Sequence, residues 1–300
     1  MEGLLIIGPS HISSGIGGVS IHVQRLRDYL VRCNQPFEFV DYKSKGFAYT
    51  LKAISGCSVA HIHISNVYAQ FILVLFARLL KKKTIVTFHG DLGRFSKCRN
   101  TLQYLSIRCC STPIVLNENS QKIAKCMNSN SLMIPAFIPP IVDEMLPVHI
   151  IKQIEQFKSQ KFKKIYATNA FSFSVDKDGN EVYGISELIL IFKNLHEYGL
   201  IFSDPSSKYS EWLSKFNQDI PGNILIINEK HSFYETLKHV DGMIRNTTTD
   251  GDSLSIKEAL FLGKIVLCTD VVPRHPSCKV YKKNDMLKLL FDFFNFKISK

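Results

Sequence analysis

The chain has 300 residues, of which 45% are hydrophobic, 21% charged and 11% aromatic. This composition is typical of a globular protein and excludes a disordered, collagen-like or coiled-coil chain, and the length favours two domains over one. The most apolar run, 71–80, is about half as long as a bilayer-spanning helix and contains Arg78. No basic segment precedes the short apolar run at 4–7, so we expect no signal peptide.

Positive charge is concentrated in the first half. Residues 1–150 contain 16 Lys and Arg against 8 Asp and Glu (+8), and residues 151–300 contain 21 against 18 (+3). Clusters such as 81–83 and Arg94 would attract phosphates or anionic lipid. Nucleic acid is not an expected partner, because no basic-aromatic RNA-binding run, zinc knuckle or basic zipper is present. The 8 cysteines form no CxxC pair, which argues against a zinc site or disulfide framework and suits a reducing cytoplasm.

Short apolar runs alternate with helical patterns along the chain. In the first half we expect strands at 4–7, 37–40, 59–64, 84–88, 114–116 and 132–134, with helices at 19–33 and 71–80, the second one buried. A proline-rich segment, 137–147, interrupts the alternation. After it we expect a helix from about 150, strands at 164–167, 224–227, 242–244 and 265–268, and helices at 184–195, 232–239, 254–262 and 285–296. The alternation predicts parallel sheets with helices on both faces.

We therefore expect an α/β fold of two Rossmann-like domains, 1–147 and 148–300, that face one another across a cleft. The last helix could pack back against the first domain. Ligands bind such sheets at the carboxyl ends of their strands, so the residues that follow the predicted strands are the candidates for function.

The first candidate is a glycine-rich loop, 13–18, between the first strand and the first helix. Gly17 and Gly18 would let backbone N–H groups approach an anion at the helix N-terminus, although a plain surface turn fits the same residues. A dehydrogenase could place Asp41 on a ribose, but the GxGxxG pattern fails because Ser20 occupies the last glycine position.

The second candidate is His89, which follows the strand at 84–88 and precedes Gly90. Its imidazole could donate to a sugar hydroxyl or move a proton, or it could simply cap the strand. His61 and His63 lie two residues apart in a predicted strand and face the same side. No third metal ligand is in register with them, so we interpret this pair as lining the core or the cleft wall.

The third candidate is the segment 245–260, in which a strand leads through a polar turn into a helix. Asp252 or Ser253 can cap that helix, and the free N–H groups near Ser253 and Leu254 suit a phosphate. Glu258 could reach ribose hydroxyls and Asp250 a sugar hydroxyl. An ordinary helix cap beside a surface acidic residue is also consistent with this segment of the sequence.

The segment from Asp250 to Leu260, followed by residues 262–266, resembles the signature of retaining GT-B glycosyltransferases of the family 4 type (glycosyl transferases group 1). The Gly17-Gly18 loop, the His89-Gly90 pair and the segment 134–138 fall in the matching order, so the resemblance covers nearly the whole chain. It implies a GT-B fold whose C-terminal domain binds a nucleotide sugar and whose N-terminal domain binds the acceptor.

The resemblance also implies roles for individual residues. Its implied catalytic residues are His89 near the reaction centre, Asp250 on the donor sugar and Glu258 on the ribose. Its implied donor-binding residues are Gly17, Gly18, Arg245, Asp252, Ser253, Leu254 and Glu258. It implies no cofactor and no metal ion, because cationic side chains and helix termini offset the charge of the leaving diphosphate.

Two features depart from the family pattern. Asp250 stands where a glutamate is usual, and the Gly-Arg…Lys-Gly motif is missing, with Tyr183-Gly184 in place of its Lys-Gly. The diphosphate then needs another cation, for which Arg245 is the first candidate and Lys177 the second. An exposed, salt-bridged arginine is the alternative interpretation of Arg245.

The function that these residues favour is retaining transfer of a sugar from a nucleotide sugar to a glycan, lipid-linked and belonging to cell-surface polysaccharide synthesis. The basic first half suits a cytoplasmic enzyme that binds peripherally at the inner face of the membrane. A nucleotide-sugar 2-epimerase and a non-catalytic or degenerate nucleotide-sugar-binding protein remain open as alternatives.

Overall fold

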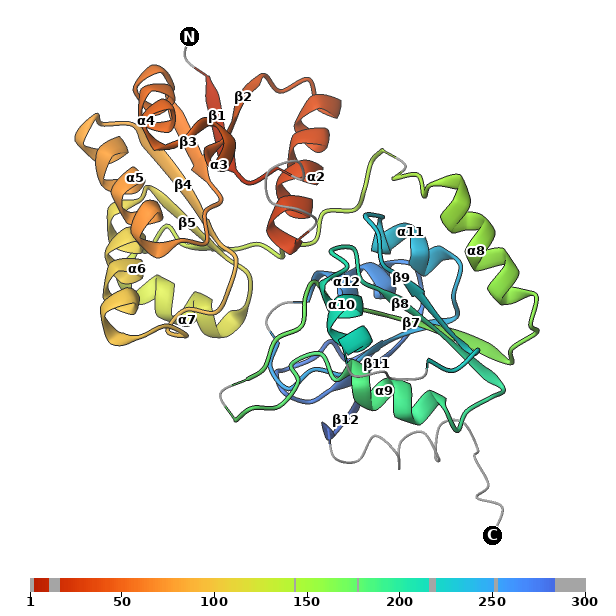
Figure 1. Cartoon of the computed structure of the whole chain (residues 1–300). Helices are drawn as coiled ribbons and strands as arrows, with labels where there is room; N and C mark the ends of the chain where they lie inside the picture. Colours follow the sequence, from red (N-terminus) through yellow and green to blue (C-terminus); the bar gives the residue numbers. More distant parts are fainter. Residues whose placement is uncertain are drawn as a thin grey trace. The chain divides into compact units, whose positions relative to one another are not determined.

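The computed structural model describes residues 3–10, 17–142, 144–176, 178–215, 220–250 and 253–283. The chain divides into two units, Met1–Val142 and Asp143–Lys300, called here the N-terminal and the C-terminal unit (Figure 1). The expected helix at 285–296 and residues 13–16 of the glycine-rich loop lie outside the described residues.

The N-terminal unit contains a six-stranded sheet in the order β2-β1-β3-β4-β5-β6, in which every neighbouring pair is parallel. Its elements are β1 (Leu4–Gly8), α2 (Gly18–Arg32), β2 (Phe37–Asp41), α3 (Tyr42–Lys45), α4 (Phe47–Gly56), β3 (Val59–Ile62), α5 (Val67–Leu79), β4 (Lys83–Phe88), α6 (Lys97–Cys109), β5 (Thr112–Val115), α7 (Glu118–Met127) and β6 (Leu132–Met133).

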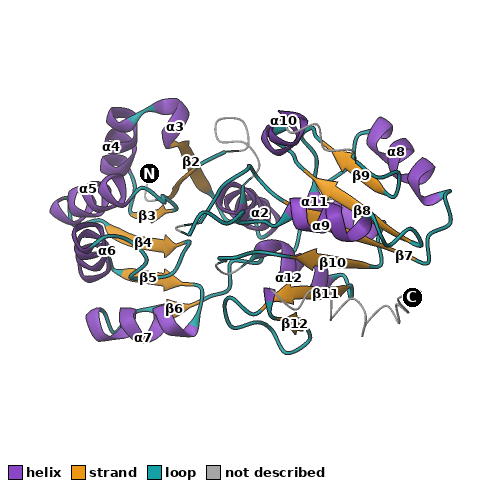
Figure 2. Ribbon diagram, turned by 60° about the horizontal axis from the view of Figure 1, so that its bottom comes forward, coloured by secondary structure: helices purple, strands orange, loops and turns teal. Residues whose placement is uncertain are grey.

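The C-terminal unit contains a second six-stranded parallel sheet, in the order β12-β11-β10-β7-β8-β9. Its elements are α8 (Val148–Lys158), β7 (Lys164–Asn169), α9 (Ile185–Phe192), β8 (Tyr198–Ser203), α10 (Lys208–Lys215), β9 (Ile224–Ile227), α11 (Phe233–Lys238), β10 (Gly242–Arg245), α12 (Leu254–Phe261), β11 (Ile265–Thr269) and β12 (Lys279–Tyr281). Within each sheet the orange arrows of Figure 2 point the same way. The prediction of parallel α/β sheets is therefore confirmed.

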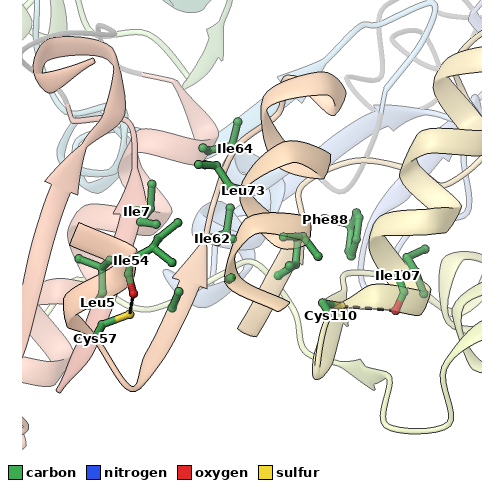
Figure 3. Packing of buried hydrophobic residues seen from close by; sticks show 14 of the residues in the cluster. Leu5, Ile7, Ile54, Cys57, Ile62, Ile64, Leu73, Phe88, Ile107 and Cys110 are labelled. Carbon is green, nitrogen blue, oxygen red and sulfur yellow. Dashed lines mark hydrogen bonds between the residues drawn. The ribbon is translucent and has the colours of Figure 1, made fainter. Parts of the chain in front are cut away.

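The core of the N-terminal unit is built from the central strands and the helices that cover them (Figure 3). Leu5, Ile62 and Val86 come from three neighbouring strands and are fully buried. Cys57 is buried in this core and packs as a small hydrophobic residue, and its thiol donates to the carbonyl of Ile54 at 3.3 Å. Continuous apolar runs mark these strands in the sequence because both faces of a parallel sheet are covered.

The C-terminal unit has two hydrophobic clusters, one on each face of its sheet. Tyr166 of β7 belongs to one cluster, whereas its neighbours Ile165 and Ala167 belong to the other. Adjacent residues of a strand point to opposite faces, so these memberships assign the clusters to the two faces. Leu200 and Ile201 of β8 divide in the same way.

The prediction of a buried helix at 71–80 is wrong in its start and in its burial. The helix, α5, begins after Asn66, whose side-chain oxygen accepts from the N–H groups of Tyr68 at 3.0 Å and Ala69 at 3.1 Å. Leu73 faces the core, but Ile72 and Leu79 are 48% and 72% exposed. No helix among the described residues is long and apolar enough to cross a membrane.

Candidate functional site

In the N-terminal unit, histidines gather at the carboxyl ends of neighbouring strands. Gly8 ends β1, His63 follows β3 and His89 follows β4, and these three strands are adjacent in the sheet. Helix α2 brings His22 to the same place. A Cβ atom on Gly8 would lie 3.0 Å from a methyl carbon of Val23 and 3.2 Å from the Cβ of His63, so the glycine permits their close approach.

The imidazole rings contact one another directly. His63 Nδ1 lies 3.0 Å from His89 Nε2, and the ring centroid of His22 lies 5.3 Å from that of His63 and 5.0 Å from that of His89. His22 Nδ1 lies 2.6 Å from the carbonyl oxygen of Ala136. A fourth ring, that of His61, is centred 4.1 Å from His63 and hydrogen-bonds the Thr87 hydroxyl through Nε2 at 2.9 Å.

Burial keeps these imidazoles neutral. Desolvation lowers the pKa of His61 to about 3, and it holds the pKa values of His63 and His89 well below 6.5. Desolvation also lowers the pKa of His22, although its hydrogen bond to Ala136 opposes the shift. At neutral pH the rings are therefore uncharged, and each can donate one hydrogen bond and accept another.

The structure places His89 at the strand end where the sequence predicts it. His63 has neighbours that the sequence does not predict, because one ring nitrogen from each of His22, His63 and His89 lies within 4.8 Å of the others. His22 escaped the sequence argument because a residue near the start of a helix has no register with a strand some forty residues away.

The predicted anion-binding glycines lie at the beginning of α2. Gly17 is the N-cap residue, and its backbone N–H donates to the Ser20 hydroxyl at 3.0 Å. A Cβ atom on Gly17 or Gly18 would meet no atom within 4 Å among the described residues. Asp41, the ribose ligand of the dehydrogenase alternative, instead caps α3 by accepting from the N–H of Lys43 at 3.1 Å.

In the C-terminal unit, two arginines share one carboxylate beyond the carboxyl end of β10. Arg245 donates to Asp250 through Nε at 3.2 Å and through Nη2 at 3.1 Å, and Arg274 donates through Nη1 at 2.9 Å. The three side chains are 12%, 6% and 4% exposed, in the order Arg245, Asp250, Arg274. We refer to them as the Arg-Asp-Arg cluster.

The Arg-Asp-Arg cluster carries one net positive charge in a buried position. Burial alone would raise the pKa of Asp250, but Arg245 and then Arg274 pull it below its usual range, so the carboxylate is ionised. Two guanidinium groups against one carboxylate leave a single positive charge. The Nη2 atom of Arg274 is buried and has no hydrogen-bond partner among the described residues. Such a group favours an anion beside it.

The interpretation of Arg245 as an exposed, salt-bridged arginine is wrong in one respect, because the salt bridge is buried. Its guanidinium also lies 5.2 Å from the ring centroid of Tyr183, and Tyr183-Gly184 stands where the family pattern has Lys-Gly. Lys177, the second candidate cation, lies outside the described residues. Arg274 was not predicted, although its place shortly after the strand β11 is a signal that could have found it.

Helix α12 begins beside this cluster. Ser253 is its N-cap residue, and the Ser253 hydroxyl lies 3.1 Å from the hydroxyl of Ser255. Leu254 is the first residue of the helix, and Glu258, one turn further, is 3% exposed. Asp252 lies outside the described residues. The helix N-terminus supplies N–H donors and positive potential, and a buried carboxylate follows within one turn.

The comparisons with known proteins identify the fold. No protein-family model matches the chain, and no curated protein matches its sequence. Among solved structures, HepE of Anabaena in complex with UDP-glucose is 11% identical, with a TM-score of 0.67 over 98% of this chain and 90% of that one. The sucrose-phosphate synthase of Thermosynechococcus elongatus is 12% identical, with a TM-score of 0.64 over 98% and 89%.

A UDP-GlcNAc 2-epimerase from Methanocaldococcus jannaschii is also similar, at 12% identity and a TM-score of 0.57 over 100% of this chain and 93% of that one. Two Rossmann-like units with six-stranded parallel sheets, matched along nearly their full length to these structures, define the GT-B fold. The prediction of a GT-B fold with two Rossmann-like units is confirmed.

Proposed function

We propose that the chain transfers a sugar from a nucleotide sugar to a glycan, with retention at the anomeric carbon. The observation that carries the proposal is the Arg-Asp-Arg cluster beside the N-terminus of α12, with the buried Glu258 one turn into the helix. In open α/β sheets the ligand site is this carboxyl edge. HepE, which has the same fold, was solved with UDP-glucose, and this supports a nucleotide sugar as the ligand.

The donor would be held by the C-terminal unit. Arg245 and Arg274 would face the diphosphate, together with the N–H groups near Ser253 and Leu254. Glu258 would accept hydrogen bonds from the ribose hydroxyls. The net positive charge of the cluster would stabilise the leaving diphosphate as negative charge develops on it, without reorganisation of the site.

Asp250 has a double role in this proposal. Both of its carboxylate oxygens accept from guanidinium groups, so it fixes the two arginines in position. It would also lie near the donor sugar, as the family resemblance implies. In the N-terminal unit, His89 would lie near the reaction centre, and Gly17 and Gly18 would lie beside the donor phosphates.

The first test is a thermal-shift panel with UDP, GDP, ADP, CMP and NAD. A ligand at a hundred times its Kd adds about 2.7 kcal/mol, which corresponds to roughly 5–10 °C for a domain of this size. We expect one nucleoside diphosphate to give this shift, the variant Glu258→Ala to lose it, and the exposed control Glu211→Ala to keep it. A shift with NAD alone would contradict the proposal.

The epimerase alternative has support from the similar archaeal 2-epimerase. Incubation with the nucleotide sugar and no acceptor separates the two activities. An epimerase gives the 2-epimer, which NMR detects, whereas a transferase needs an acceptor before it releases nucleoside diphosphate and glycan product. A nucleotide shift with neither product would favour the non-catalytic, nucleotide-sugar-binding alternative.

The proposed acceptor is a lipid-linked glycan of cell-surface polysaccharide synthesis, reached from the cytoplasmic face of the membrane. The support is a surface of α5 on which Ile72, Leu75 and Leu79 are exposed and which lysines 81–83 follow in the chain. Exposed apolar side chains followed closely in the chain by basic residues suit an anionic bilayer. Neutralising lysines 81–83 together with Arg94 should abolish liposome binding, and unchanged binding would refute a membrane role.

A further inference from the structure

We propose that His22, His63 and His89 bind a divalent transition-metal ion. One ring nitrogen from each lies within 4.8 Å of the other two, and the set lies at the carboxyl edge of β3 and β4. Imidazole is a preferred ligand of Zn²⁺, Cu²⁺, Ni²⁺ and Co²⁺. The inference needs only the N-terminal unit and does not depend on the proposed function.

The tautomer of His22 is fixed by its hydrogen bond. A carbonyl oxygen can only accept, so the contact of 2.6 Å with Ala136 means that Nδ1 of His22 carries the hydrogen. Its Nε2 atom then holds a lone pair. Metal-binding histidines commonly donate their other ring nitrogen to a backbone carbonyl in this way, which orients the ring and increases its basicity.

His63 contributes a second observation. It is fully buried, and its Nε2 atom has no hydrogen-bond partner among the described residues, whereas its Nδ1 atom contacts His89. The His63–His89 contact brings two ring nitrogens together and uses only one N–H, and a cation there would instead bind the lone pairs of His63 Nδ1 and His89 Nε2, with the hydrogen of the His63 ring on Nε2.

The geometry is close to that of a metal site. Metal–nitrogen bonds of about 2.0–2.1 Å in a tetrahedron place ligand nitrogens about 3.4 Å apart. His63 and His89 already approach to 3.0 Å, and the His22 nitrogen, within 4.8 Å of both, needs to move by at most about 1.4 Å to reach this spacing. Gly8 holds α2 against His63 and so limits how far the rings can separate. Three histidines leave a fourth position for water or a substrate oxygen, as in catalytic zinc sites.

The test is a titration of the full chain with Co²⁺, after removal of metals by a chelator and alkylation of the exposed cysteines Cys33, Cys98 and Cys126. Alkylation matters because surface thiols also bind Co²⁺. We expect a visible ligand-field band that saturates at one equivalent and disappears when Zn²⁺ is added. No saturable band in the alkylated wild type would overturn the proposal.

His22→Gln and His89→Gln are the test variants, because the buried His63 could be needed for folding. Each should weaken Co²⁺ binding about a hundredfold or more, since even changes behind the ligands cost roughly 10–100-fold. His61→Gln is the matched control: an amide can still reach the Thr87 hydroxyl, and binding should be unchanged. Far-UV circular dichroism verifies that each variant is folded. A band that survives in both test variants, or that weakens equally in His61→Gln, would refute the three-histidine assignment.

Discussion

Acid should unfold the N-terminal unit before the C-terminal unit. The cause is the histidine cluster, whose rings are neutral in the folded unit and free to accept protons once it unfolds. When a folded pKa lies below the unfolded one, the stability is present above the unfolded value and is lost as the pH falls towards the folded value. The relevant window therefore runs from pH 6.5 down to about 3.

The size of the effect follows from His61. Its pKa is 6.5 when unfolded and about 3 when folded. At pH 5, about 1.5 pH units below the unfolded pKa, protonation of this ring stabilises the unfolded state. At about 1.36 kcal/mol per pH unit, the free energy of unfolding falls by about 2 kcal/mol. Burial also holds the pKa values of His63 and His89 well below 6.5, so both rings add to this loss in the same direction.

The two units can be followed separately in urea. Trp212 of α10 is the single tryptophan, so its fluorescence reports the C-terminal unit, while far-UV circular dichroism reports both. With a chelator present, we expect the fluorescence and dichroism unfolding curves to separate at pH 5. The part of the dichroism curve that reports the N-terminal unit should move to lower urea concentration. The urea midpoint of the Trp212 fluorescence transition should move less with pH. The reason is that burial lowers the pKa of fewer of the described histidines in the C-terminal unit, His231 among them.

Two outcomes would refute this reasoning. One is a dichroism curve that does not move between pH 7.5 and pH 5. The other is an unchanged pH response in His61→Gln, which removes one titrating ring and should recover about 2 kcal/mol at pH 5. Carboxylates contribute little between pH 7.5 and pH 5, because their ordinary pKa values lie near 4.

Three further predictions test single features. Asp250→Asn leaves Arg245 and Arg274 buried without their counter-charge, so it should cost about 3–5 kcal/mol and lower the Tm of the C-terminal unit; an unchanged Trp212 transition would contradict the buried cluster. Gly8→Ala should cost about 1–3 kcal/mol in a dichroism melt, because its new carbon overlaps neighbouring side chains; wild-type stability would mean that the neighbours yield. Burial raises the pKa values of two thiols to about 12, so iodoacetamide should leave both unmodified in the native protein by mass spectrometry, and their labelling would contradict the packing. These thiols are Cys110 and Cys268.

The buried strands were predictable because each is a short apolar run bounded by turn residues. Strand β9, Ile224–Ile227, matches its prediction to the residue. Helix α6, Lys97–Cys109, was missed because it presents polar residues to the interior, Gln103 and Ser106 among them, and so has no apolar stripe. Strand β8, Tyr198–Ser203, was missed although every residue is buried, because Gly199 interrupts its apolar run.

The candidate site was predictable only as a set of positions. The turn after β10 and the histidine after β4 follow from the rule that parallel sheets bind ligands at strand ends. That Asp250 would hold two arginines could not be deduced, because Arg274 lies 24 residues further along and reaches it only after the next strand has formed. The approach of His22 to His63 likewise depends on the packing of α2 over Gly8.

The strand order of the C-terminal sheet has a consequence for synthesis on the ribosome. Strand β7 pairs with β8 on one side and with β10 on the other, and β10 begins at residue 242, about 70 residues after β7 ends. At a translation rate of roughly 5–20 residues per second, the edge of β7 that will pair with β10 stays unpaired for about 4–14 s. During this interval it presents unpaired backbone groups and β-forming side chains, which invites pairing with other chains. Nascent chains stalled short of β10 should therefore bind chaperones more than chains stalled well after β12.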